Sequence, residues 1–148
     1  MEYISLQRAT LDDLETFLTI ERSLSGSKTY SAADTEEEAR EELTASEVYF
    51  IKFNKQIAGS IQYQIKNPDK VYLSGLVVKP EFQGKGIARA ALEIVLEKFK
   101  TVNQIYLVTH PENTKAIKLY ESLGFTVGEK IENYFGDGEP RIVLTKQN

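Results

Sequence analysis

The segment from Gln83 to Arg89 contains two glycines and a lysine, and these residues are suited to binding an anion. It follows an apolar run and precedes a second apolar pattern that begins at Ile87, so a strand should lead into a helix here. The first backbone N–H groups of a helix lack helical partners and carry the positive end of its dipole. Gly84 and Gly86 let an anion approach the backbone, and Lys85 adds a cation. The loop therefore predicts a ligand with a phosphate group.

Two familiar nucleotide-binding loops do not fit this segment. A Walker loop has Ser or Thr after its Gly-Lys pair, whereas Lys85 is followed by Gly86. A dinucleotide fingerprint that began at Gly84 would need a third glycine where Arg89 stands. Taken alone, the glycine pair is equally typical of an ordinary strand-to-helix turn. The flanking sequence must decide between the two interpretations.

Composition excludes several other kinds of site. The chain has no Cys and one His, which excludes disulfides, a thiolate zinc site, a cysteine nucleophile and a cluster of His ligands. Its 18 Lys and Arg against 22 Asp and Glu give a formal charge of -4, so we expect no nucleic-acid partner. The sequence opens without a basic and apolar leader, and no apolar run approaches the ~18 residues of a membrane span. We therefore expect a cytoplasmic protein with no membrane partner.

One domain over residues 1–148 is expected to position the loop, because no repeat or linker divides the chain. Alternating apolar residues predict strands, and apolar stripes after capping residues predict helices. In chain order we expect a strand over 4–6, helices over 10–22 and 35–46, strands over 48–53, 57–65 and 71–78, a helix from 87, a strand over 105–108, a helix over 113–123, and strands over 125–131 and 141–145. The strand over 71–78 should lie in the middle of the sheet, buried on both faces and parallel to the strand over 105–108.

Two motifs of one known family lie in and after the loop. Gln83 to Ala88 fits the signature Q/R-x-x-G-x-G/A, directly after an apolar strand that ends V-x-P. The signature N-x-x-A-x-x-x-Y-E-x-x-G-F matches Asn113, Ala116, Tyr120, Glu121, Gly124 and Phe125. With these motifs and this order of elements, the sequence resembles the GCN5-related N-acetyltransferase (GNAT) superfamily.

The resemblance implies a GNAT fold of class α/β (α+β). Its mixed, mostly antiparallel sheet should have about seven strands flanked by about four helices, with two central parallel strands that part. Acetyl-coenzyme A is the implied cosubstrate, with its pyrophosphate over the glycine loop and its pantetheine arm along the parted strand. Gly75 is well placed for the bulge that begins the parting. The residues implied in donor binding are Leu76, Val77, Val78, Gln83, Gly84, Lys85, Gly86, Ile87, Ala88, Arg89 and Asn113.

Tyr120 is the catalytic residue that the resemblance implies. The implied reaction transfers an acetyl group directly to a primary amine, such as a peptide N-terminus, a polyamine or another small amine. Tyr120 would give a proton to the departing thiolate, and the backbone N–H of Val77 or Val78 would stabilise the oxyanion. Asn113 and Tyr120 are about two helical turns apart and share one face. The alternatives are an N-cap for Asn113 and half-buried packing for Tyr120.

The sequence assigns no general base. The family often places a glutamate on the central strand or the next parallel strand, but residues 73–74 and 105–109 contain no carboxylate. Glu21 is favoured as a solvated helix residue, with a base that acts through water as the alternative. His110 is interpreted as a surface or capping residue rather than a base. A non-catalytic acyl-coenzyme A binding or sensing module is therefore the alternative function.

Three further features concern the acceptor and the assembly. The helix over 35–46 carries Glu36, Glu37, Glu38, Glu41 and Glu42. This face is interpreted as solvated, with attraction of cationic acceptors as the alternative. The segment from Ile131 to Pro140 is similar to a hairpin of ribosomal-protein-type N-terminal acetyltransferases, which would give Tyr134 and Phe135 an acceptor-side role. Exposed strand edges are compatible with a homodimer.

Overall fold

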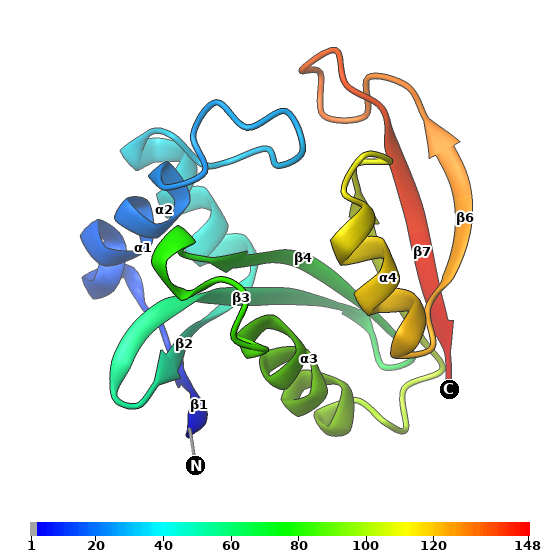
Figure 1. Ribbon diagram of the computed structural model, residues 1–148, viewed down its shortest axis with the longest axis horizontal. Helices are drawn as coiled ribbons and strands as arrows, with labels where there is room; N and C mark the ends of the chain where they lie inside the picture. Colours follow the sequence, from blue (N-terminus) through cyan, green and yellow to red (C-terminus); the bar gives the residue numbers. More distant parts are fainter. Residues whose placement is uncertain (1–2) are drawn as a thin grey trace.

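An open seven-stranded sheet organises residues 3–148, the part of the chain that this computed structural model describes (Figure 1). The strands are β1 (Ile4–Arg8), β2 (Glu47–Phe53), β3 (Gln56–Asn67), β4 (Lys70–Val78), β5 (Gln104–Thr109), β6 (Thr126–Ile131) and β7 (Arg141–Gln147). Their spatial order is β1-β2-β3-β4-β5-β7-β6; β4 and β5 are parallel, and every other neighbouring pair is antiparallel. The predicted mixed sheet, with its central strand at 71–78, is confirmed.

Four α-helices cover the two faces of the sheet. They are α1 (Leu14–Arg22), α2 (Glu36–Ala45), α3 (Ile87–Lys98) and α4 (Thr114–Ser122), with 3₁₀ turns at Leu11–Asp13 and Pro80–Phe82. The helices α1 and α2 pack on one face, and α3 and α4 pack on the other. Over residues 3–148, no helix combines the length and the apolar character that crossing a bilayer requires.

Local chemistry fixes most element boundaries close to the predicted positions. Thr10 and Asp13 form the capping box before α1, and the Thr35 hydroxyl accepts the N–H of Glu38 at the start of α2. Asn54 has a φ of 48°, which the tight turn between β2 and β3 requires. Gly124, with a φ of 99°, follows α4 and ends it.

The two parallel strands part after a bulge. The pairing of β4 with β5 is limited to the first four residues of β4. On its other edge, β4 pairs Leu73 with Tyr63 and then Gly75 with Gln62, so Ser74 is an extra residue. Beyond Ser74, β4 stays paired with β3 but has no partner in β5. The bulge therefore lies where Gly75 was expected to allow it.

The bulge also exchanges the faces of β4. Before it, Val71 and Leu73 are buried in the core beneath α3. After it, Val77 is buried in the other core against α1 and α2, whereas Leu76 and Val78 pack toward the α3 side. One extra residue in a strand reverses the side to which each later side chain points. This explains why β4 is buried on both faces, as the sequence predicted.

Candidate active site

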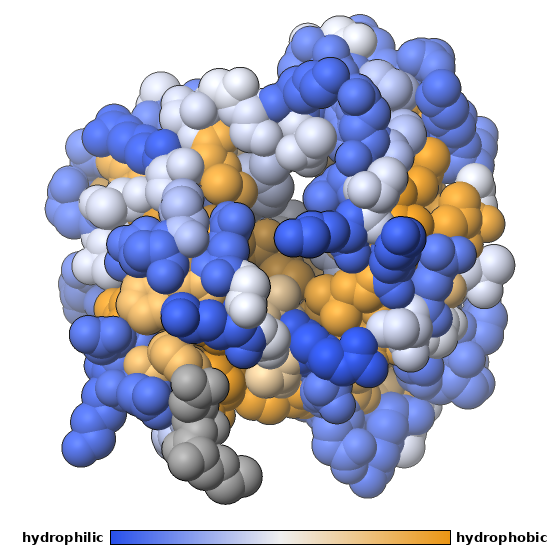
Figure 2. Space-filling model, viewed as in Figure 1, coloured by the Kyte–Doolittle hydropathy of each residue, from blue (hydrophilic) through white to orange (hydrophobic). Residues whose placement is uncertain are grey.

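A cavity of about 410 Å³ opens where β4 and β5 part. Its walls come from α1, α2 and the segment between them, from β3, β4 and β5, from α3 and α4, and from the loop between β6 and β7. Figure 2 shows this face hollowed near its centre, with hydrophobic residues at the base of the hollow. Among the residues expected to act, Leu76, Asn113 and Tyr120 line the cavity, while Val77, Val78 and the loop from Gln83 to Arg89 do not.

The glycine loop has the backbone geometry of an anion site. Gly84 and Gly86 have φ values of 79° and 78°, in the left-handed region that favours glycine. Gly86 is the N-cap of α3, and its carbonyl accepts the N–H of Ala90, so the N–H groups before Ala90 have no helical partner. A Cβ at either glycine would meet no atom within 4 Å, so the backbone faces open space there. A phosphate group fits these features.

Two side chains of the expected donor site brace the walls around the loop. Gln83 Nε2 donates to the Val78 carbonyl at 3.0 Å and so ties the loop to the end of β4. Arg89 Nη1 donates to Ser122 Oγ at 2.9 Å and so ties the start of α3 to the end of α4. Lys85 is exposed beside them. The loop therefore presents its backbone and Lys85 to solvent, while Gln83 and Arg89 hold its position.

Beyond the bulge, the backbone of β4 has hydrogen-bonding groups that face the gap. Lys79 N–H donates to the Ala58 carbonyl of β3 at 2.8 Å. Because an antiparallel ladder alternates, Val77 also turns its backbone toward β3, and Leu76 and Val78 turn theirs away from β3. The bond from Gln83 to the Val78 carbonyl agrees with this alternation. Of the two expected N–H groups, that of Val78 thus turns toward the gap and that of Val77 toward β3, so the expectation for Val77 is wrong. Leu76 turns its N–H toward the gap as well and is the one of these residues that lines the cavity.

Tyr120 and Asn113 both face the cavity from α4 and its start. The Tyr120 ring packs edge-on against Phe125 with centroids 5.8 Å apart, and burial raises the pKa of Tyr120 to about 12. The phenol is therefore protonated near neutral pH and able to donate a proton. Asn113 is at the N-cap position, but its side chain makes no capping bond and instead donates to Thr109 Oγ1 at 3.3 Å. Asn113 is thus the N-cap residue, as the alternative expected, but its side chain does not cap the helix.

Glu21 is buried in the cavity wall, so the interpretation of it as a solvated helix residue is wrong. Its side chain is 2% exposed at the end of α1, because residues 29–33 fold back over it. Tyr30 Oη donates to one carboxylate oxygen at 2.9 Å and Ala33 N–H donates to the other at 3.1 Å. Burial raises the pKa of Glu21 to about 7. Its place in the apolar stripe of α1, seven residues after Leu14, was the sequence signal for this burial.

His110 is also buried, at 1% exposed, so the surface interpretation is wrong. Its Nδ1 accepts the N–H of Glu112 at 3.0 Å, which stabilises the turn between β5 and α4. The neutral ring then carries its proton on Nε2, which lies 2.7 Å from Glu139 Oε1. His110, Glu112 and Glu139 converge, but neither ring nitrogen keeps a free lone pair for a metal. His110 instead ties the end of β5 to the loop between β6 and β7.

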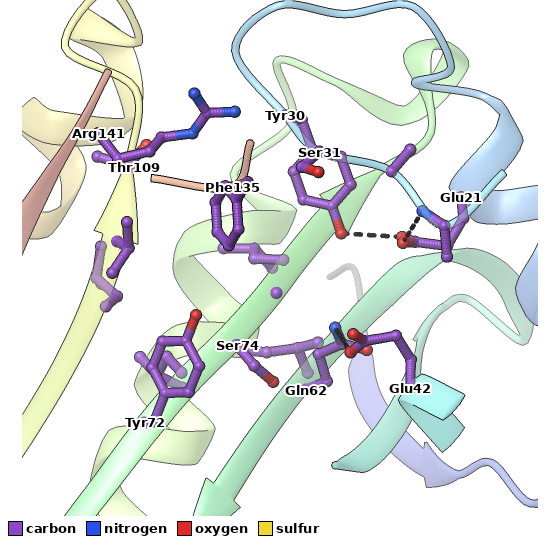
Figure 3. A pocket seen from close by; sticks show the side chains of 18 of the residues that line it. Glu21, Tyr30, Ser31, Glu42, Gln62, Tyr72, Ser74, Thr109, Phe135 and Arg141 are labelled. Carbon is purple, nitrogen blue, oxygen red and sulfur yellow. Dashed lines mark hydrogen bonds between the residues drawn. The ribbon is translucent and has the colours of Figure 1, made fainter. Parts of the chain in front are cut away.

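Acidic residues of α2 and an aromatic residue of the loop between β6 and β7 also line the cavity. Glu38, Glu41 and Glu42 line it. Glu38 and Glu41 are exposed, as the solvated interpretation expects, whereas Glu42 is half-buried and departs from it. Phe135 also lines it, but Tyr134 does not. Figure 3 shows Glu21, Glu42 and Gln62 on one side and Thr109 and Arg141 on the other.

Arg141 fixes the loop between β6 and β7 that carries Phe135. Its side chain is almost completely buried, Nη2 lies 3.0 Å from Asp137 Oδ2, and Nη1 donates to the Pro140 carbonyl at 3.1 Å. The guanidinium also lies 5.1 Å from the centroid of the Phe135 ring. The buried guanidinium of Arg141 therefore holds the loop, and with it Phe135, in place at the cavity.

We expect the buried Glu21 carboxylate to make the free energy of unfolding fall as pH rises. The folded pKa is about 7 and the ordinary value is 4.5, so the folded protein keeps a proton that the unfolded chain releases. The stabilisation is complete below pH 4.5 and is lost as pH rises through 7, a change of about 3 kcal/mol. Urea unfolding of the wild type and of Glu21→Gln at pH 5 and pH 8 measures this change in the free energy of unfolding. The same pH dependence in both proteins would contradict the assignment.

Comparison with known proteins identifies the family. The model of the acetyltransferase (GNAT) family matches residues 14–125, which include the bulged strand, the glycine loop and α4. The chain belongs to the GNAT family.

Solved structures agree with this GNAT fold at low sequence identity. A GNAT family acetyltransferase from Elizabethkingia anophelis, with acetyl-CoA bound, matches with a TM-score of 0.75 and 21% identity over 98% of each chain. The ribosomal-protein alanine N-acetyltransferase of Escherichia coli matches with a TM-score of 0.79 and 24% identity, over 99% of this chain and 94% of that one.

Curated relatives match this GNAT protein over part of its length. Spermidine N(1)-acetyltransferase of Escherichia coli strain K12 is 39% identical over 73 residues, which are 47% of this chain and 39% of the relative. Ribosomal protein bS18-alanine N-acetyltransferase of Salmonella typhimurium is 36% identical over 69 residues, which are 45% of this chain and 47% of the relative. The chain thus spans less than half the length of either relative.

Proposed function

We propose that this GNAT protein transfers an acetyl group from acetyl-coenzyme A directly to a primary amine. The observation that carries the proposal is the cavity between β4 and β5, where the protonated phenol of Tyr120 and the buried carboxylate of Glu21 line one space. The matched relatives are named as N-acetyltransferases of spermidine and of a ribosomal protein, which supports an amine acceptor. A cytoplasmic location and a homodimer stay predictions.

The donor fits the open backbone beside the cavity. The left-handed glycines and the free N–H groups at the start of α3 would hold the pyrophosphate, and Lys85 would add a charge. The Leu76 carbonyl and the Val78 N–H, which face the gap, would pair with the amides of the pantetheine arm, as an added strand does. Asn113 would contact the same arm from α4.

Three groups of the chain would then serve the transfer. Glu21 would take a proton from the acceptor ammonium, directly or through water, so that the neutral amine can attack the thioester carbonyl carbon. The N–H of Leu76, which turns toward the gap and lines the cavity, would stabilise the oxyanion. Tyr120 would give its proton to the thiolate that leaves. The sequence assigned no base because the residues of β4 and β5 where the family often has one carry no carboxylate. Glu21, on α1, would supply the base instead.

A panel of amines tests the proposal. Release of free coenzyme A thiol would be measured with acetyl-coenzyme A and peptides, polyamines, amino acids and aminoglycosides, and acetylated products would be identified by mass spectrometry. Thiol release that depends on an amine is the expected result. Tight donor binding without turnover on any amine would overturn it and favour the non-catalytic acyl-coenzyme A module.

Gly86→Ala should weaken acetyl-coenzyme A binding by more than about tenfold. Alanine in the left-handed region costs about 1–2 kcal/mol, and relief of that strain would turn the N–H groups at the start of α3 away from the phosphate. Calorimetry would give the Kd. Gly26→Ala is the matched control, because Gly26 has a φ of 82° and equally open surroundings outside the loop. Equal donor affinity in the two variants would exclude this role for Gly86.

A further inference from the structure

Gln62 presents a buried acceptor that has no donor. The residue is 4% exposed on β3, and its Oε1 is the buried side-chain atom without a hydrogen-bond partner among the residues described. Its Nε2 donates to Glu42 Oε2 at 3.0 Å, so a flipped amide would face oxygen against oxygen. A buried acceptor without a donor is destabilising, because it has lost its bonds to water. Gln62 lines the cavity, so a ligand that brings N–H donors would satisfy this oxygen.

The amide of Gln62 lies directly over the bulge of β4. A Cβ at Gly75 would be 2.6 Å from Gln62 Nε2, so only a residue without a side chain leaves room for the amide. Gly75 is opposite Gln62 in the sheet and immediately precedes the segment whose backbone faces the gap. The orphaned oxygen is therefore close to the segment on which acetyl transfer is proposed.

The surrounding charge favours a cation. Four carboxylates line the cavity, Glu21, Glu38, Glu41 and Glu42, and the one cation among its lining residues is Arg141. Asp137 and the Pro140 carbonyl already bind that guanidinium. Burial raises the pKa of Glu42, which is expected of a carboxylate that lacks a cation beside it. A ligand that supplies positive charge would relieve this cost.

The carboxylates of α2 lie at two levels. Glu38 and Glu42 are four residues apart, so they share a face of the helix and are separated by just over one turn, or about 6 Å of rise. Glu42 is half-buried beside Gln62, and Glu38 and Glu41 are exposed at the rim. One ammonium group at Gln62 and Glu42 would leave the rim pair without a cation.

Aromatic rings also line the cavity. Tyr30, Tyr72 and Phe135 line the cavity, and the Tyr72 ring stacks on Tyr106 with centroids 4.8 Å apart. Ring faces accept both methylene chains and ammonium groups. The walls therefore suit an aliphatic chain that carries a positive charge at each end.

We propose that the cavity takes its acceptor as an aliphatic diamine or polyamine, an inference that rests on the proposed acetyl transfer. Gln62 Oε1 and the Glu42 carboxylate hold the amine group that reacts, and Glu38 and Glu41 bind a second ammonium group. A peptide with a single α-amine lacks the second charge.

The test compares acceptors that differ in the second charge. We expect kcat/KM for 1,4-diaminobutane and spermidine to exceed that for 1-aminobutane and for an alanine-first tetrapeptide by about 30-fold or more. Glu38→Gln/Glu41→Gln should lower the value for 1,4-diaminobutane about tenfold. The matched control is Glu36→Gln/Glu37→Gln, which removes the same charge from residues of α2 that do not line the cavity, and should change it less than about twofold.

Calorimetric binding of 1,4-diaminobutane to the protein separates the two proposals. Binding that Glu38→Gln/Glu41→Gln weakens and the control does not, without turnover on any amine, would overturn the proposed transfer and support the cation site. Turnover of the monoamine or the peptide as efficient as that of diamines would overturn the cation site and leave the transfer standing. Failure to bind the diamine, or equal losses in the two variants, would also overturn the cation site.

Discussion

Tyr120→Phe should lower kcat about 100-fold at saturating acetyl-coenzyme A and amine, while the Kd for acetyl-coenzyme A changes less than about twofold. A general acid contributes mainly in the transition state, where the sulfur gains negative charge as the bond to the acetyl carbon breaks. The raised pKa of about 12 keeps the Tyr120 phenol protonated over the pH range of the assay. Phenylalanine removes this proton but keeps the ring that packs on Phe125.

Two measurements show whether the Tyr120 hydroxyl acts as the acid. Tyr106→Phe removes a half-buried tyrosine hydroxyl that does not line the cavity, so this control should keep kcat within about twofold. In an acetyl thioester made from a thiol of lower pKa, the thiolate can leave without a proton from the enzyme. Such a donor should restore much of the rate that Tyr120→Phe loses. A wild-type kcat in this variant would remove Tyr120 from the acid role and return it to packing.

Glu21→Gln should lower kcat/KM about 100-fold at pH 8 and change the pH profile. The base works when it is deprotonated, so the wild-type rate should rise with pH through about 7, the pKa to which burial raises Glu21. The variant should lose this rise near pH 7, the acid limb of the profile. It should keep only the rise in kcat/KM that comes from deprotonation of the acceptor amine itself. Glu15→Gln, on the exposed side of the same helix, is the control and should retain the limb.

Tyr30→Phe is a second test of Glu21 as the general base. The hydrogen bond from the Tyr30 hydroxyl lowers the pKa of Glu21, so its removal should move the acid limb of the kcat/KM profile to higher pH. The direction of this shift distinguishes a base from a residue that only fills the wall. A limb that stays in place in Tyr30→Phe, or that persists in Glu21→Gln, would show that another group accepts the proton.

The sequence predicted the fold and the backbone geometry of the glycine loop. Caps such as Thr10 and Thr35, the glycines at 84 and 86, and the bulge next to Gly75 were all found near the expected positions. Each depends on the conformational preferences of a few neighbouring residues, which a sequence displays directly. The motif from Asn113 to Phe125 placed Tyr120 on the cavity face of α4 for the same reason, because spacing along a helix determines its faces.

Which ionisable groups are buried was decided by contacts between distant segments. Glu21 is buried because residues 29–33 fold over it, His110 because Glu139 reaches it from another loop, and Glu42 because Gln62 of β3 bonds it. Local sequence fixes which way a backbone turns, but burial and the pKa of a carboxylate depend on what packs against it across the chain. The sequence by itself therefore determined the elements and the anion loop, and only the tertiary structure determined which carboxylates face the cavity, because desolvation is a property of the packed assembly.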